Sequence, residues 1–126
     1  MTKNIIIMEF SYKEKKACLL ILMALADCDG RRNREEIQVL KRCNTVLGVT
    51  IDEMLGGITF EASYMAKNEV KSIINPMSES KKLILEECMR KIMEADGPAN
   101  ETERGTWWTI QMEHELPTWL SRNNKV

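Results

Sequence analysis

Apolar residues recur at intervals of three and four along most of the chain, a spacing that places them on one face of an α-helix. The clearest case is the segment at about 78–94, whose apolar face consists of Leu85, Cys88, Met89 and Ile92. Residues 5–10 alone are also compatible with a strand, because they form a short apolar run without helical spacing. The pattern therefore predicts an all-α fold.

Helix starts carry a recurrent signal, a Ser, Thr or Asn followed three residues later by Glu. In such a capping box the first side chain accepts a backbone N–H of the first turn, and the glutamate accepts the backbone N–H of the cap. Boxes begin at Ser11, Asn33, Thr50 and Asn100, and Ser78 is a simpler cap. Glycines and prolines mark the helix ends. We expect five or six helices, at about 12–27, 34–47, 51–55, 59–74, 78–94 and 101–116.

The length of the chain, 126 residues, is near that of one domain, and its 44% hydrophobic content is too high for disorder. We predict a single domain over residues 1–126, with its core at about 11–120 between a flexible N-terminal arm and a flexible C-terminal tail. The longest apolar run, residues 17–26, is half of the roughly 20 residues that a membrane span needs. No membrane span and a cytoplasmic location are expected.

Charge and cysteine usage exclude several classes of function. The 18 basic and 19 acidic residues give a net charge of −1, so no nucleic-acid partner is expected. Cys18, Cys28, Cys43 and Cys88 form no C-x-x-C pair and match no zinc-binding spacing. Three of them lie in apolar helical stretches, which predicts buried, reduced thiols.

Signals for catalysis are weak. His114, the single histidine, lies between two glutamates, and we expect it at the surface. The chain has no phosphate-binding loop and no dinucleotide fingerprint. We therefore predict no catalytic residues and no organic cofactor. Trp107, Trp108 and Trp119 could mark a protein interface, but tryptophan in a domain of this size is more often part of the core.

Two stretches of the chain, residues 27–36 and 94–103, match each other as acid-x-Asp-Gly-x-x-Asn-x-x-Glu. The matching helix–turn–helix units predict an internal pseudo-repeat. The glycine, the asparagine and the last glutamate are explained by hairpin geometry. The other acids fall at a helix C-terminus, where the helix dipole disfavours each carboxylate by ~0.3–1 kcal/mol. They therefore suggest a second role.

That role would be cation binding. Carboxylates in loops suit hard cations such as Ca²⁺ or Mg²⁺. The spacing does not fit an EF-hand, because Gly30 falls at position 4 of the motif, where an EF-hand has its glycine at 6. If the two units pack about a pseudo-two-fold axis, six acids could converge on a metal: Asp27, Asp29, Glu36, Glu94, Asp96 and Glu103.

The same motifs resemble those of the TerB-like (tellurite-resistance) family. The similarity rests on Ala-Leu-Ala-Asp-Cys-Asp-Gly at 24–30 with Glu36, Val-Leu-Gly-Val-Thr at 46–50, and Ala-Asp-Gly at 95–97 with Glu103. It spans about residues 17–116. After Glu103 the chain departs from the family pattern, because no second Leu-Gly follows.

We expect a non-enzymatic module that binds a protein partner. The resemblance implies an all-helical fold and an association with tellurite and stress resistance. It also implies metal binding at Asp29, Glu36, Asp96 and Glu103, and less securely at Asp27 and Glu94. Two alternatives stay open. A metal-bound acidic cluster with an open coordination position could be an enzyme, and the chain could be a structural helical subunit of a larger assembly.

Overall fold

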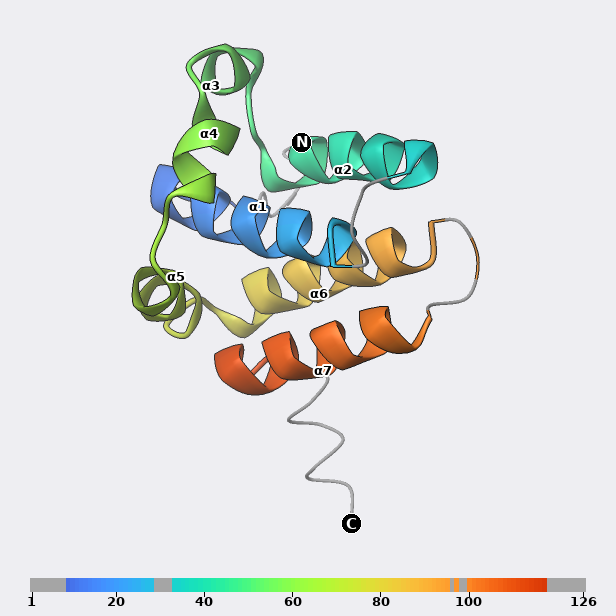
Figure 1. Cartoon of the computed structure of the whole chain (residues 1–126). Coiled ribbons are helices and arrows are strands. Elements are labelled where there is room, and N and C mark those ends of the chain that lie inside the picture. Colours follow the sequence, from blue (N-terminus) through green and yellow to red (C-terminus); the bar gives the residue numbers. More distant parts are fainter. Residues whose placement is uncertain (1–8, 29–32, 96, 98–99, 118–126) are drawn as a thin grey trace, which may run out of the picture.

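In the computed structural model, residues 9–28, 33–95, 97 and 100–117 are described. All secondary structure in these residues is helical, which confirms the all-α prediction. The helices are α1 (Tyr12–Ala26), α2 (Arg34–Leu47), α3 (Ile51–Leu55), α4 (Ile58–Ser63), α5 (Lys67–Ile74), α6 (Glu79–Met93) and α7 (Glu101–His114). Figure 1 shows α1, α2, α6 and α7 stacked along one direction, while α3, α4 and α5 lead from α2 to α6 along one end of the stack.

The predicted helix starts are confirmed. Ser11, Asn33, Thr50 and Asn100 each cap a helix in a complete capping box. The Ser78 side chain accepts the backbone N–H of Lys81 at the start of α6. These signals are local, because each cap involves residues three positions apart.

The helix expected at 59–74 is instead two helices, α4 and α5, so the described residues hold seven helices rather than five or six. The break occurs at Ala66, whose backbone is extended (φ −75°, ψ 151°). An unbroken helix over 58–74 would be roughly 25 Å long and would touch α1 only where the two cross. With the break, Ile58 of α4 and Ile74 of α5 are both fully buried, and both helices pack on α1.

Helix α1 is the centre of the core. It packs against α2, α4, α5, α6 and α7, so it is buried on nearly all sides and accommodates the long apolar run at 17–26. Three of its four leucines, Leu19, Leu22 and Leu25, are at most 1% exposed, and burying such a side chain stabilises the fold by about 1.5–3 kcal/mol. No helix in the described part of the chain is long and apolar enough to cross a bilayer.

Candidate functional site

The fold brings the ends of four helices together at one end of the molecule. Figure 1 shows the C-terminal ends of α1 and α6 and the N-terminal ends of α2 and α7 on the same side. These ends carry Asp27, Glu36, Glu94 and Glu103 of the predicted metal site. Asp29 and Asp96 lie outside the described residues.

Asp27 and Glu94 have matching positions and conformations. Asp27 ends α1 with φ −98° and ψ 1°, and Glu94 ends α6 with φ −98° and ψ 8°. The backbone N–H of each donates to a carbonyl of the preceding turn, Met23 in one case and Arg90 in the other, at 3.0 Å. Both residues are exposed at these helix ends, where the dipole favours a nearby cation.

Glu36 and Glu103 are the glutamates of two capping boxes. The Oε1 atom of Glu36 accepts the backbone N–H of Asn33 at 3.0 Å, and the Oε1 atom of Glu103 accepts that of Asn100 at 2.9 Å. Both residues are buried, at 0% and 3% exposure. Withdrawing a carboxylate from water is unfavourable unless its charge is compensated, so the charged groups around these two glutamates matter.

The other two capping-box glutamates provide a contrast. The Glu14 side chain is 19% exposed and pairs with Lys81 at 2.8 Å, while that of Glu53 is 23% exposed and pairs with Lys15 at 3.0 Å. Each lysine helps to lower the pKa of its glutamate. In the described residues Glu103 has no such lysine or arginine partner. The Glu103 box thus differs in environment from the Glu14 and Glu53 boxes, although their local geometry is the same.

No group of three or more His, Cys, Asp or Glu side chains within the described ranges is arranged to hold a metal ion. The two central aspartates of the predicted site are not among these residues. Metal binding at the acidic turns therefore stays a prediction.

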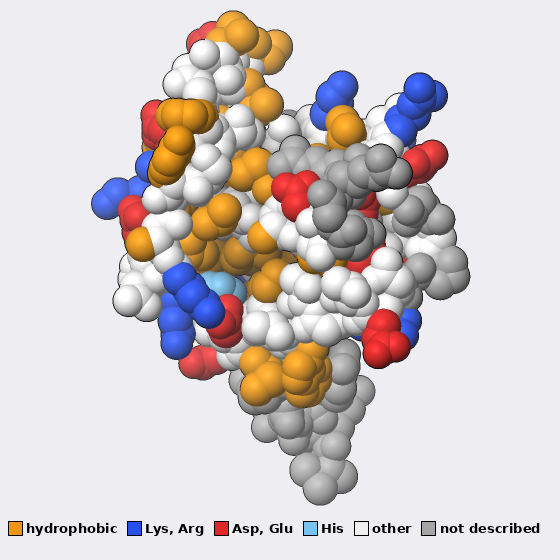
Figure 2. Space-filling view, in the orientation of Figure 1, with side chains coloured by type: hydrophobic (Ala, Val, Ile, Leu, Met, Phe, Trp, Pro, Cys, Tyr) orange, Lys and Arg blue, Asp and Glu red, His pale blue; other side chains and the backbone are white. Residues whose placement is uncertain are grey.

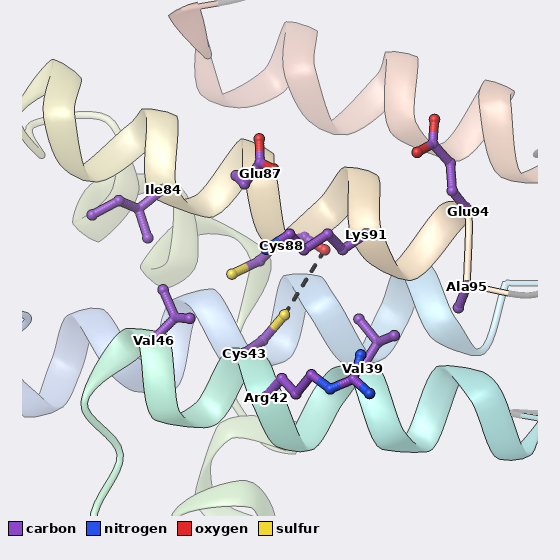
Figure 3. A pocket seen from close by; sticks show the side chains of 10 residues that line it. All are labelled: Val39, Arg42, Cys43, Val46, Ile84, Glu87, Cys88, Lys91, Glu94 and Ala95. Carbon is purple, nitrogen blue, oxygen red and sulfur yellow. Dashed lines mark hydrogen bonds between the residues drawn. The ribbon is translucent and has the colours of Figure 1, made fainter.

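A groove of about 480 Å³ lies between α2 and α6 (Figure 3). It ends at Glu94 and Ala95, beside the second acidic turn. Sequence reasoning missed this groove, since its walls come from helices that are distant along the chain. Its lining consists of Val39, Arg42, Cys43, Val46, Ile84, Glu87, Cys88, Lys91, Glu94 and Ala95.

Two thiols line this groove. The Sγ atom of Cys43 lies 4.0 Å from the backbone oxygen of Cys88. Hydrogen bonding with the Cys88 side chain lowers the pKa of the Cys43 thiol, against the effect of burial. Cys43, Cys88 and Cys18 are buried and none is in a disulfide, which confirms the prediction of buried thiols. Cys28 is only partly buried.

The prediction of a surface position for His114 is wrong. This residue, in the last turn of α7, is 5% exposed. It is buried because α7 packs on α5 and α6. Burial lowers the pKa of the imidazole, and Lys67, Lys71 and Lys82 add to this effect, while Glu113 opposes it.

An exposed apolar surface covers α3 and α4, at the upper left of Figure 2. Ile51 is 77% exposed, Leu55 83%, Phe60 64% and Tyr64 74%.

The tryptophans contribute less to the surface. Trp107 packs against the core as expected, whereas Trp108 is 43% exposed, contrary to the prediction of a core position. Trp119 lies outside the described residues.

Comparison with known proteins identifies the fold alone. No protein-family model matches the chain, and no curated protein matches it. The chain is similar to the crystal structure of PG1108, a protein of unknown function from Porphyromonas gingivalis W83, with a TM-score of 0.78 and 23% sequence identity. The similarity covers 93% of this chain and 88% of the other.

Proposed function

We propose that this protein is a non-enzymatic TerB-like module of the tellurite- and stress-resistance type, which binds a divalent cation through its two acidic turns. The observation that carries the proposal is the burial of Glu36 and Glu103, two equivalent capping glutamates at the same end of the bundle. A nearby cation would offset the unfavourable burial of the Glu103 carboxylate, which pairs with no lysine or arginine in the described residues.

The chemistry of the acidic turns suits Ca²⁺ or Mg²⁺. The ligands available are carboxylate and carbonyl oxygens, which hard cations prefer. The C-terminal ends of α1 and α6 add the negative ends of two helix dipoles. In this proposal Asp29 and Asp96 supply the central carboxylates, Asp27 and Glu94 flank them, and Glu36 and Glu103 complete the site. The two turns act as related halves of one pseudo-repeated site.

Thermal unfolding of chelator-stripped protein with Ca²⁺, Mg²⁺, Mn²⁺ or Zn²⁺ tests the proposal. A cation at 100 times its dissociation constant stabilises the folded state by about 2.7 kcal/mol, which raises the melting temperature by several degrees. We expect this increase with Ca²⁺ or Mg²⁺, and its loss in the Asp29→Asn/Asp96→Asn double variant. Asp52→Asn is the matched control, since Asp52 is an exposed acid in α3. No shift with any cation, or an equal shift in the double variant, would refute cation binding.

The module also binds a protein partner in this proposal, through the apolar surface of α3 and α4. Exposed apolar residues that cluster on one face are typical of protein interaction sites. Phe60 and Tyr64 reinforce this face, because their rings meet edge to face at a centroid distance of 4.9 Å. The partner would contribute apolar side chains to cover Leu55 and Phe60.

A Leu55→Asp/Phe60→Asp variant should keep its helical circular dichroism spectrum and lose the partner. Both side chains are largely exposed, so the fold does not depend on them. The measurement is co-purification of the tagged wild-type and variant proteins from the native host. Sedimentation of the pure wild-type protein shows whether the partner is a second copy of the chain. Equal recovery of the same partner by both proteins would contradict this assignment of the surface.

A further inference from the structure

The α2–α6 groove contains a pair of cysteines that the proposed cation site does not use. Cys43 is in α2 and Cys88 is in α6, and Figure 3 shows both sulfur atoms in the space between the two helices. The Sγ of Cys43 lies 4.0 Å from the backbone oxygen of Cys88. Each residue is only 2% exposed, but both belong to the groove lining, so the groove provides the approach to the thiols.

The two thiols are chemically distinct. Hydrogen bonding with the Cys88 side chain, together with the positive charge of Lys91, lowers the pKa of Cys43. The same pairing, together with burial, raises the pKa of Cys88. Cys43 is thus the more readily ionised thiol of the pair. Since the thiolate is the reactive form of cysteine, Cys43 is the expected nucleophile.

We propose that Cys43 and Cys88 are a reversible redox pair, oxidised by a small hydroperoxide that enters the groove between α2 and α6. This inference is independent of the proposed cation binding. The Cys43 sulfur attacks the terminal peroxide oxygen and breaks the O–O bond, which yields a sulfenic acid on Cys43 and releases an alcohol, or water from hydrogen peroxide. The Cys88 sulfur then attacks the Cys43 sulfur, and the hydroxyl leaves with the Cys88 proton as water. Two thiols are oxidised to one disulfide, and one peroxide is reduced.

The size of the groove and the position of the two helices fit this chemistry. A groove of about 480 Å³ admits a small peroxide. The disulfide would link two helices that already pack against each other. It would hold α2 and α6 together along the wall that ends at Glu94.

The test treats the reduced full-length protein with tert-butyl hydroperoxide in modest excess, and then blocks the remaining thiols with an alkylating reagent in denaturant. We expect the intact mass to show the loss of two hydrogen atoms, and peptide mapping to show a Cys43–Cys88 cross-link that dithiothreitol reverses. Alkylation of both Cys43 and Cys88 after peroxide treatment, or a disulfide joining another pair instead, would overturn the proposal.

Variants separate the roles of the two sulfurs. Cys88→Ser should stop at the sulfenic acid, which dimedone traps on Cys43, and Cys43→Ser should prevent oxidation of Cys88. Cys28→Ser is the matched control, because this partly buried cysteine lies outside the groove, and it should react like the wild type. A dimedone adduct on Cys88 in place of Cys43 would contradict the assignment. If a serine variant fails to fold, the wild-type peptide map decides by itself.

Discussion

The burial of His114 predicts that the folded state loses stability as the solution becomes mildly acidic. Its pKa in the folded protein is lowered from the usual 6.5, first by burial and then by Lys71, Lys82 and Lys67, with Glu113 acting in the opposite direction. The unfolded chain therefore binds a proton more readily than the folded one. It follows from linkage that stability increases with pH through this range and is lost as pH falls below about 6.5.

The loss of stability caused by protonation of His114 has a definite upper limit. If the imidazole stays neutral in the folded state, lowering the pH from 7.5 to 5.5 favours unfolding by about 1.4 kcal/mol, the free energy of one proton over roughly one pH unit. The loss ends once the pH falls below the pKa of the folded state. Glu14 and Glu53 have lowered pKa values, so the stability they contribute is lost at lower pH, below about 4.5, and does not interfere.

Urea unfolding at pH 7.5 and 5.5, followed by circular dichroism, measures this effect. His114 is the single histidine of the chain, so a His114→Gln variant removes imidazole titration from the protein altogether. We expect the variant to lose most of the pH dependence, whatever its stability at pH 7.5. An equal loss of stability in wild type and variant between these two pH values would refute the reasoning.

Three further predictions concern stability, and urea unfolding checks each of them. Asn100→Ala removes the cap that accepts the Glu103 backbone N–H at 2.8 Å, and it should destabilise the fold by about 1 kcal/mol. An unchanged free energy of unfolding would show that the first turn of α7 contributes nothing to stability. Leu22→Ala leaves a cavity at a fully buried position of α1 and should destabilise by about 2–5 kcal/mol; a loss well under 1 kcal/mol would argue against the central position of α1. Gly48→Ala places a Cβ on a left-handed residue (φ 80°) whose nearest neighbour is Lys15 Cε at 3.9 Å. The destabilisation of roughly 1 kcal/mol therefore reflects backbone conformation, and an Asn at this position should recover part of it.

Features that depend on neighbouring residues could be predicted from the sequence. A capping box joins residues three apart, so Ser11 and Asn33 marked helix starts without knowledge of the rest of the molecule. The apolar spacing in 78–94 likewise identified the buried face of α6, including Leu85 and Met89. Such signals were sufficient for the all-α fold class.

The same local rules failed where tertiary packing decided the outcome. Ile58, Ala62, Val70 and Ile74 have the spacing of one helix, yet the chain breaks at Ala66 because both halves gain contact with α1. The two glutamates beside His114 suggested a surface position, and only the packing of α7 reveals its burial.

The sequence by itself determined the all-α class and the helix caps, because these depend on short-range hydrogen bonds and on the helical period. Tertiary structure alone decided that four helix ends meet on one side, that Glu36 and Glu103 are buried, and that Cys43 lies against Cys88. Residues 45 positions apart along the chain come together only through the packing of whole helices, and no local pattern records which helix packs against which.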